Sequence, residues 1–285
     1  MMMKSRFQIP ALPAVLGAIF SLQAGAVIAK NLFPVLGAPA TASLRIGLSA
    51  LMLLLVNRPS PGKLSAAQWK AIIPYGLCLG AMNGIFYLSL ARIPLGLAVT
   101  LEFIGPLLLA ISGSRRLIEF LWVLLAGAGI ALIAPWSEGS IDLFGAAMAL
   151  LAGGFWAGYI ILGRRSSKVI EGGQAVTIGM VFATLVILPF GIAEGGFVNF
   201  EPYMILSGTA LALLCSAIPF TLEMQALKQL PAKTFSILMS LEPAIAALCG
   251  LVFLNEQLAF REWAAVALVV LASTGTTLSR DRKNL

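Results

Sequence analysis

Long apolar segments, separated by short polar ones, follow each other along the whole chain. Ten such runs, of about 17 to 24 residues each, are long enough to cross a bilayer as helices. The connections are short and rich in turn residues, such as NRPSPGK and PWSEGS, so they leave no room for a soluble domain. The pattern predicts an all-α membrane protein with ten transmembrane helices, at 11–30, 39–57, 69–91, 95–112, 118–135, 142–163, 174–192, 203–226, 233–253 and 261–279.

The overall composition agrees with this pattern. Hydrophobic residues make up 59% of the 285 residues and charged residues only 11%, against about 25% charged residues in a soluble domain. The apolar runs do not alternate with polar positions, which argues against a transmembrane barrel. The first run follows Lys4 and Arg6, as in a signal peptide. Because it reaches spanning length, we expect an uncleaved first helix.

Basic residues predict how the chain is oriented in the membrane. If both termini are cytoplasmic, 15 of the 19 Lys and Arg residues lie on the inner side, three lie outside, and Arg45 falls within the second run. Lys and Arg are enriched in cytoplasmic loops, so this orientation is expected. It also accounts for the net charge of +7 without a nucleic-acid partner.

Two of the apolar runs share one plan. The segments 91–113 and 227–250 each contain an entry proline, a central acid, a second proline and a glycine. Three pairs of residues are 137 positions apart: Pro94 and Pro231, Pro106 and Pro243, and Gly113 and Gly250. At an offset of 133, Ser21-x-x-x-Gly25 matches Gly154-x-x-x-Gly158, and small residues at this spacing let helices approach closely.

These matches predict a duplication of five helices, with domains at 1–138 and 139–285. Since five is odd, the second copy enters the membrane from the opposite side. The result is a pair of inverted five-helix repeats, an arrangement typical of secondary transporters with a site near the midplane.

Four charged residues lie within the runs, namely Arg45, Glu102, Glu223 and Glu242. Each costs about 2.5–3.5 kcal/mol at a helix centre unless it faces water or a partner. Glu102 lies roughly 11 Å and Glu242 roughly 14 Å from the nearer end of its run, at the rise of an α-helix. Both therefore fall near the midplane of a core about 30 Å thick. We expect them to bind protons or a substrate ammonium group, rather than only structural hydrogen-bond partners.

Prolines follow these acids and break their helices. Pro106 and Pro243 each remove a donor and clash with the carbonyl four residues earlier. For Pro106 that carbonyl belongs to Glu102. Either the freed carbonyl binds a ligand, or the proline produces only a packing kink. On this basis Glu102 is the expected main proton carrier.

The remaining polar groups in the runs have two interpretations. Arg45 either binds a substrate carboxylate, pairs with an acid, or extends to the interface. Glu223, which follows the helix-breaking Pro219, lies nearer a helix end. Several uncharged side chains either contact ligand or join helices to one another: Asn83, Tyr87, Gln225, Ser236 and Ser240. Trp156 is interpreted as a packing residue.

Several classes of function are disfavoured. The chain has no histidine, and its three cysteines stand alone in apolar runs. Nucleophilic triads, HExxH zinc sites and histidine-ligated haem are therefore excluded. We expect no enzyme, no metal site and no cofactor.

Specific segments resemble a known transporter family. They are SLRIGL, GAMNGIFYLSL, IPLGLAVTLEFIGPL, SRR, IPFTLEMQAL and LPAKTFSILMSLEPAIAALCGLVFLNEQL. They resemble the EamA-type branch of the drug/metabolite transporter superfamily, and within it the bacterial threonine/homoserine exporter group. The resemblance implies proton-driven export of small amino acids through a cavity between the two halves. By position it carries over Arg45, Asn83, Tyr87, Glu102, Glu223 and Glu242.

The sequence thus predicts a multi-pass transporter of the bacterial inner membrane, a monomer or homodimer, that exports small neutral amino acids by proton antiport. Its partners are the bilayer, protons and a small-molecule substrate, without nucleic acid. The alternative is the same fold exporting another small metabolite or drug, such as a nucleoside, a purine or an amphipathic cation.

Overall fold

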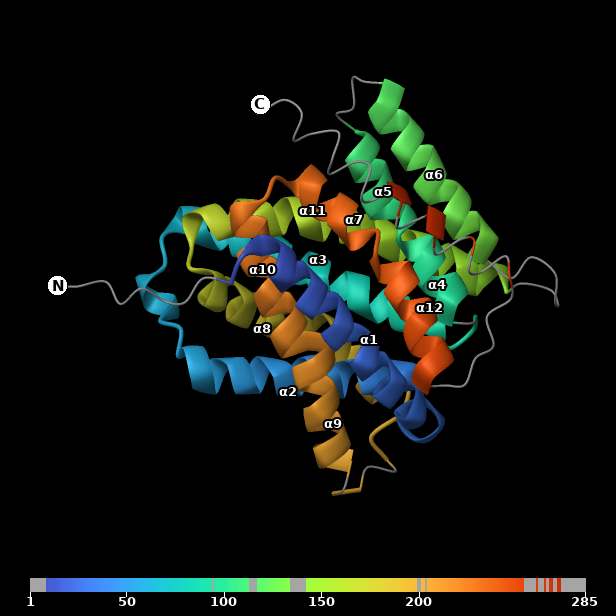
Figure 1. Ribbon diagram of the computed structural model, residues 1–285. Helices are drawn as coiled ribbons and strands as arrows, with labels where there is room; N and C mark the ends of the chain where they lie inside the picture. The colour runs from blue at the N-terminus through green and yellow to red at the C-terminus, as the bar shows by residue number, and fades with distance from the viewer. Residues whose placement is uncertain are drawn as a thin grey trace.

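A computed structural model describes residues 9–93, 95–112, 117–133, 142–198, 201–202 and 204–253, together with positions 260, 264, 267, 268, 271 and 272. All regular structure in these ranges is helical (Figure 1). The final apolar run, 261–279, falls almost wholly outside the described residues, as do both chain ends.

The helices before residue 134 are α1 (Ala11–Leu36), α2 (Ala38–Asn57), the short η1 (Pro61–Lys63), α3 (Ala66–Leu90), α4 (Leu95–Glu102), α5 (Ile104–Ile111) and α6 (Leu117–Ile133). Those that follow are α7 (Leu143–Val169), α8 (Gly172–Ala193), α9 (Met204–Ala212), the π turn η2 (Leu213–Ala217), α10 (Ile218–Gln229), α11 (Ala232–Met239) and α12 (Glu242–Phe253).

Five helical segments in the described part of the chain are long and apolar enough to cross a membrane. They are α2, α3, α7, α8 and the continuous segment Met204–Gln229. Each coincides with an apolar run found in the sequence, and the all-α membrane class is confirmed. A bilayer interior offers no water to satisfy backbone groups, so spanning segments form helices.

Prolines interrupt the helices at two matching places. The run 95–112 forms α4 and α5, separated at Phe103, and the run 233–253 forms α11 and α12, separated at Ser240 and Leu241. Pro106 and Pro243 lie in the first turn after each break, where a missing donor costs least. Phe103 and Ser240 are 137 positions apart, the same offset as the proline pairs.

A third interruption precedes Pro219. There the helix passes through the π turn η2 before α10 begins at Ile218. π turns within helices are uncommon and are frequent at functional sites. The two proline-broken runs lie side by side, with α5 against α11 and α4 against α12 (Figure 1).

Helices distant in sequence make the main contacts. α3 packs against α7 and α8, α2 against α8, and α1 against α10 (Figure 1). Glycine makes the closest approaches possible. A Cβ on Gly105 of α5 would lie 1.8 Å from the carbonyl oxygen of Gly153 in α7, and a Cβ on Gly25 of α1 would lie 2.3 Å from the Cys215 sulfur. Gly154, by contrast, has nothing within 4 Å of an added Cβ. The small-residue motif at Gly154 therefore packs through its neighbour Gly153 and through Gly158.

Two cysteine contacts are related by the offsets found in the sequence. The Cys78 thiol donates to the carbonyl of Phe155, with 3.0 Å between sulfur and oxygen, and the Cys215 thiol donates to the carbonyl of Leu22 at 3.3 Å. The cysteines are 137 positions apart and their acceptors 133. Each contact joins a helix before residue 138 to one after it.

Candidate functional site

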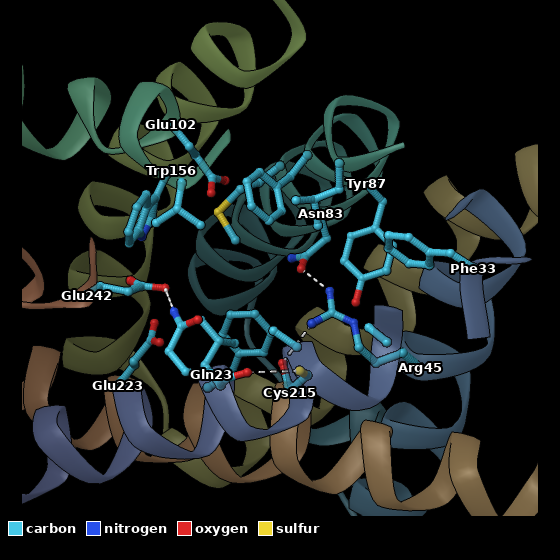
Figure 2. A pocket seen from close by; sticks show the side chains of 18 of the residues that line it. Gln23, Phe33, Arg45, Asn83, Tyr87, Glu102, Trp156, Cys215, Glu223 and Glu242 are labelled. Atoms are coloured by element: carbon cyan, nitrogen blue, oxygen red, sulfur yellow. Dashed lines mark hydrogen bonds between the residues drawn. The ribbon is translucent and has the colours of Figure 1, made fainter. Parts of the chain in front are cut away.

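A cavity of about 310 Å³ lies among α1, α2, α3, α4, α7, η2, α10 and α12. Its polar lining has two distinct ends, which Figure 2 shows on opposite sides. One end carries Arg45, Asn83 and Tyr87, and the other carries Gln23, Glu102, Glu223 and Glu242. Apolar and aromatic side chains make up the rest of the lining, among them Phe33, Met82, Phe86, Trp156 and Phe220.

Arg45 forms the cationic end. It extends from α2 and is only 2% exposed. Its Nη1 donates to the carbonyl of Cys215 at 2.8 Å and its Nη2 to Oδ1 of Asn83, while its guanidinium carbon lies 4.8 Å from the centre of the Tyr87 ring. Asn83 is held in turn, since its Nδ2 donates to the carbonyl of Leu79. These contacts fix the fork of donors toward the cavity.

The charge of Arg45 is not matched by a carboxylate nearby. The described residues place no carboxylate oxygen within 4.0 Å of the Arg45 guanidinium, and the ion pair of Arg92 with Asp142, at 3.2 Å, lies on the surface. Nε of Arg45 is buried without a hydrogen-bond partner in the described structure. A buried guanidinium with an unused donor is costly unless a ligand completes it. The arrangement is therefore suited to an anionic group of a ligand.

Three carboxylates form the opposite end, each in its own surroundings. Glu242, at the start of α12, accepts a hydrogen bond from Nε2 of Gln23 at 3.3 Å. Glu223, on α10, accepts one from the Tyr159 hydroxyl at 2.8 Å. Glu102, the last residue of α4, points into the cavity in Figure 2. All three are at most 7% exposed.

Packing of α4 against α7 fixes the position of Glu102. A Cβ on Gly153 would lie 2.3 Å from the Glu102 carbonyl oxygen. That carbonyl, which Pro106 was expected to free for a ligand, is instead covered by the backbone of α7. Only the side chain of Glu102 is presented to the cavity. Glu102 was preferred as proton carrier because Pro106 was expected to free its carbonyl, and the structure removes that basis.

Aromatic rings close one end of the cavity, beyond Glu223. The rings of Tyr75 and Tyr159 have centroids 5.4 Å apart, and those of Tyr159 and Phe220 are 5.8 Å apart. Further along the same helices, Ser166 donates to the carbonyl of Ala71 at 3.0 Å. Tyr75 and Tyr159 are fully buried, so α3 and α7 pack closely beyond Glu223.

Six of the residues singled out in the sequence come together around the cavity: Arg45, Asn83, Tyr87, Glu102, Glu223 and Glu242. Gln225, Ser236 and Ser240 are not among its lining residues. The Ser236 hydroxyl donates to the carbonyl of Ala232 within its own helix, which satisfies it without a ligand.

The sequence interpretation missed two polar participants, Gln23 and Tyr159. Each contacts a cavity acid directly. The sequence signal for both was a polar side chain in an apolar run, and this signal is weak for uncharged groups. Trp156 also lines the cavity, with its ring 5.9 Å from that of Phe103, so it both packs and borders the open space.

The two polar ends suit a zwitterion, with an anionic group at Arg45 and a cationic group at the acids. The volume lies at the lower end of the range for ligand sites, about 300–1,000 Å³. In the described part of the chain, no cluster of three or more metal-ligating side chains occurs. A helical membrane protein with a charged cavity between its helices belongs to the class of small-molecule transporters.

Comparison with known proteins agrees with that class. A model of the EamA-like transporter family matches residues 143–278. The chain is 41% identical over 268 residues to a threonine/homoserine exporter RhtA of Salmonella typhimurium strain SL1344, covering 93% of this chain and 90% of that one. It is 42% identical over 267 residues to the protein of the same name from Escherichia coli K12, with the same coverage. The chain belongs to the EamA-like transporter family.

More distant proteins share the fold. A solved structure described only as a crystal structure of protein superposes with a TM-score of 0.72, covering 96% of this chain and 99% of that one, at 19% identity. The apolar helices and the bacterial relatives identify a multi-pass protein of the bacterial inner membrane, which is a transporter and not an enzyme.

Proposed function

We propose that this protein exports small neutral amino acids, with threonine and homoserine as the favoured substrates. The observation that carries the proposal is the pair of polar ends across one small cavity, with the Arg45 guanidinium and its unpartnered Nε at one end and three carboxyl groups at the other. The α-carboxylate binds Arg45 and the α-ammonium group binds the acidic end. The names of the relatives from Salmonella and Escherichia support this choice of substrate.

The architecture proposed for this task is two inverted five-helix repeats, 1–138 and 139–285, with ten transmembrane helices and cytoplasmic termini. The matched cysteine contacts and the helix breaks at Phe103 and Ser240 support the repeat, since both follow the offsets 137 and 133. In the proposed orientation, the end of the cavity closed by Tyr75 and Tyr159 faces the cytoplasm. Rocking of one half against the other alternates access to the cavity.

Export requires an energy source, and the proposed one is proton antiport. Carboxylates buried near the midplane are the groups in this cavity that bind either a proton or an ammonium group. If the proton and the substrate each bind the acidic end more tightly in a different state of the protein, their exchange becomes coupled.

A counterflow assay tests the choice of substrate. Purified protein is reconstituted into liposomes loaded with unlabelled threonine, and entry of labelled threonine is followed. Saturable counterflow with threonine and homoserine is expected, and a lipophilic dye cation should neither enter nor compete. Counterflow of the dye without any of threonine would contradict the proposal. It would favour the alternative of an amphipathic-cation exporter, which the aromatic lining could also accommodate.

A further inference from the structure

The acids at the cavity are not equivalent, because they lie at opposite ends of helices. Glu102 is the last residue of α4, and Glu242 is the first residue of the 12-residue helix α12. A helix carries partial negative charge at its C-terminus and partial positive charge at its N-terminus. The start of α12 therefore favours the ionised form of Glu242, whereas at Glu102 the end of α4 is offset by the start of α5 at Ile104.

Hydrogen bonding separates the two roles further. One oxygen of Glu242, Oε1, accepts from Gln23, while the other, Oε2, is buried with no partner in the described structure. At the unpartnered Oε2 a neutral carboxyl group costs less than an ionised one, because an unpaired buried charge is the more expensive of the two. The ionised form is stabilised by the hydrogen bond from the Gln23 amide and by the partial positive charge at the start of α12. Both proton states are therefore accommodated, as a group that must gain and lose a proton in each cycle requires.

Gln23 connects this group to the other half of the chain. It lies on α1, whereas Glu242 lies on α12, and α1 packs directly against α12. A glutamine amide presents an N–H donor to a carboxylate and, after a half-turn, a carbonyl acceptor to a carboxyl O–H. The contact thus depends both on whether Glu242 is protonated and on the relative position of the two halves. It therefore couples protonation of Glu242 to the movement of the halves.

We propose that Glu242 and Gln23 form the proton-carrying pair, with Gln23 as its positioning residue, and that Glu102 is left to bind the substrate ammonium group. In the step itself, the O–H bond of the Glu242 carboxyl breaks and its proton passes to water that enters the cavity. The carboxylate remains, held by the Gln23 N–H, until a proton returns from the other side. The proposal rests on the proposed proton-coupled export and assigns its two functions to different acids.

Other titratable and charged groups surround Glu242, and they set the limits of the assignment. Glu102 approaches from α4, Glu223 from α10 and the Cys215 thiol from η2, while Arg45 lies across the cavity on α2. Glu223 is held by the Tyr159 hydroxyl, and both lie after residue 138. That bond does not cross between the proposed halves, so it does not report their movement in the way that the Gln23 contact does.

The first test needs no substrate. The infrared C=O stretch of protonated carboxyl groups is titrated against pH in purified protein. One titrating band should be missing in Glu242→Gln and should persist in Glu102→Gln, where loss of the neighbouring acid alters only its midpoint. In Gln23→Met, which keeps the side-chain length, the midpoint of the band should rise by about one pH unit, because the ionised form of Glu242 loses a charge-assisted hydrogen bond. Persistence of the band in Glu242→Gln, or an unshifted midpoint in Gln23→Met, would overturn the proposal.

A matched control comes from the same helix. Ser21 donates to the carbonyl of Leu214 at 2.7 Å, a contact that also joins α1 to the later helices but lies outside the cavity lining. Ser21→Ala should leave the midpoint where it is in the unaltered protein. An equal shift in Ser21→Ala would show that any loosening of α1 is sufficient, and would remove the special role of Gln23.

The second test separates the two acids during transport. Glu242→Gln should lose at least tenfold more of the accumulation driven by an imposed pH gradient than of threonine counterflow, which needs no proton. Glu102→Gln should lose both activities. The reverse pattern, with gradient-driven accumulation intact in Glu242→Gln, would overturn the assignment. A complete lack of threonine counterflow in the unaltered protein would instead refute the proposed substrate, while the infrared titration would still decide the proton site.

Discussion

Replacement of Arg45 tests how the cavity recognises its ligand. Arg45→Met keeps an unbranched side chain and removes the guanidinium group. The Nη atoms are already held by Asn83 and by the Cys215 carbonyl, and Nε is buried without a partner in the described residues. A substrate carboxylate would therefore meet an oriented, desolvated donor fork.

The expected loss follows from the chemistry of such a pair. Removing one member of a buried, hydrogen-bonded charge pair costs about 2–5 kcal/mol. At about 1.4 kcal/mol for each factor of ten, Arg45→Met should weaken threonine binding by at least about 30-fold. Arg45→Lys keeps the charge but not the planar fork, so a smaller loss of about tenfold is expected.

The assay compares threonine with threoninol, its analogue without a carboxylate, as competitors of labelled threonine in counterflow. The unaltered protein should prefer threonine strongly, and Arg45→Met should bind both alike. This cycle isolates the contact between Arg45 and the carboxylate from general damage to the site. Equal losses for both competitors in Arg45→Met, or an undiminished preference for threonine, would refute the reasoning.

Four other substitutions have definite expected outcomes. Gly153→Ala should abolish correctly folded protein, because its Cβ would lie 2.3 Å from the Glu102 carbonyl oxygen, whereas Gly154→Ala, with nothing within 4 Å, should be neutral in size-exclusion profile and transport. Tyr159→Phe should lower the melting midpoint and slow counterflow, since Glu223 loses a donor at 2.8 Å; an unchanged rate and midpoint would contradict this. The pKa of Asp142 is lowered, chiefly by the Gly145 backbone N–H and also by Arg92, so its stabilising effect is present above its usual range and is lost as pH falls through the lowered value. The melting midpoint of Asp142→Ala should accordingly fall less on acidification, and an equally steep fall would argue against it.

Much of the fold was predictable because its signals are local. Apolar length determines which segments span, and proline chemistry breaks a helix wherever it occurs, as at Pro106 and Pro243. Arg45 and the three acids were also identifiable, since a charge inside an apolar run needs a cavity or a partner. Their meeting around one cavity follows from those same constraints.

Other parts depend on the rotation of each helix about its axis, which the sequence leaves open. Whether Gly153 or Gly154 faces the neighbouring helix is decided by packing of α4 and α5 on α7. The same packing covers the Glu102 carbonyl that proline chemistry alone would leave free. Gln23 was overlooked because an uncharged polar side chain in a helix costs little and carries no partner information. Ser236, conversely, looked available but is satisfied within its own turn.

In the proposed mechanism, one cavity exchanges a proton for an amino acid. The most direct measurement records threonine efflux and proton entry together, in proteoliposomes loaded with threonine and a pH-sensitive dye. Threonine efflux should be accompanied by proton entry in the unaltered protein, and Glu242→Gln should lower the proton entry that accompanies each threonine. Saturable threonine efflux with no proton entry in the unaltered protein would contradict it.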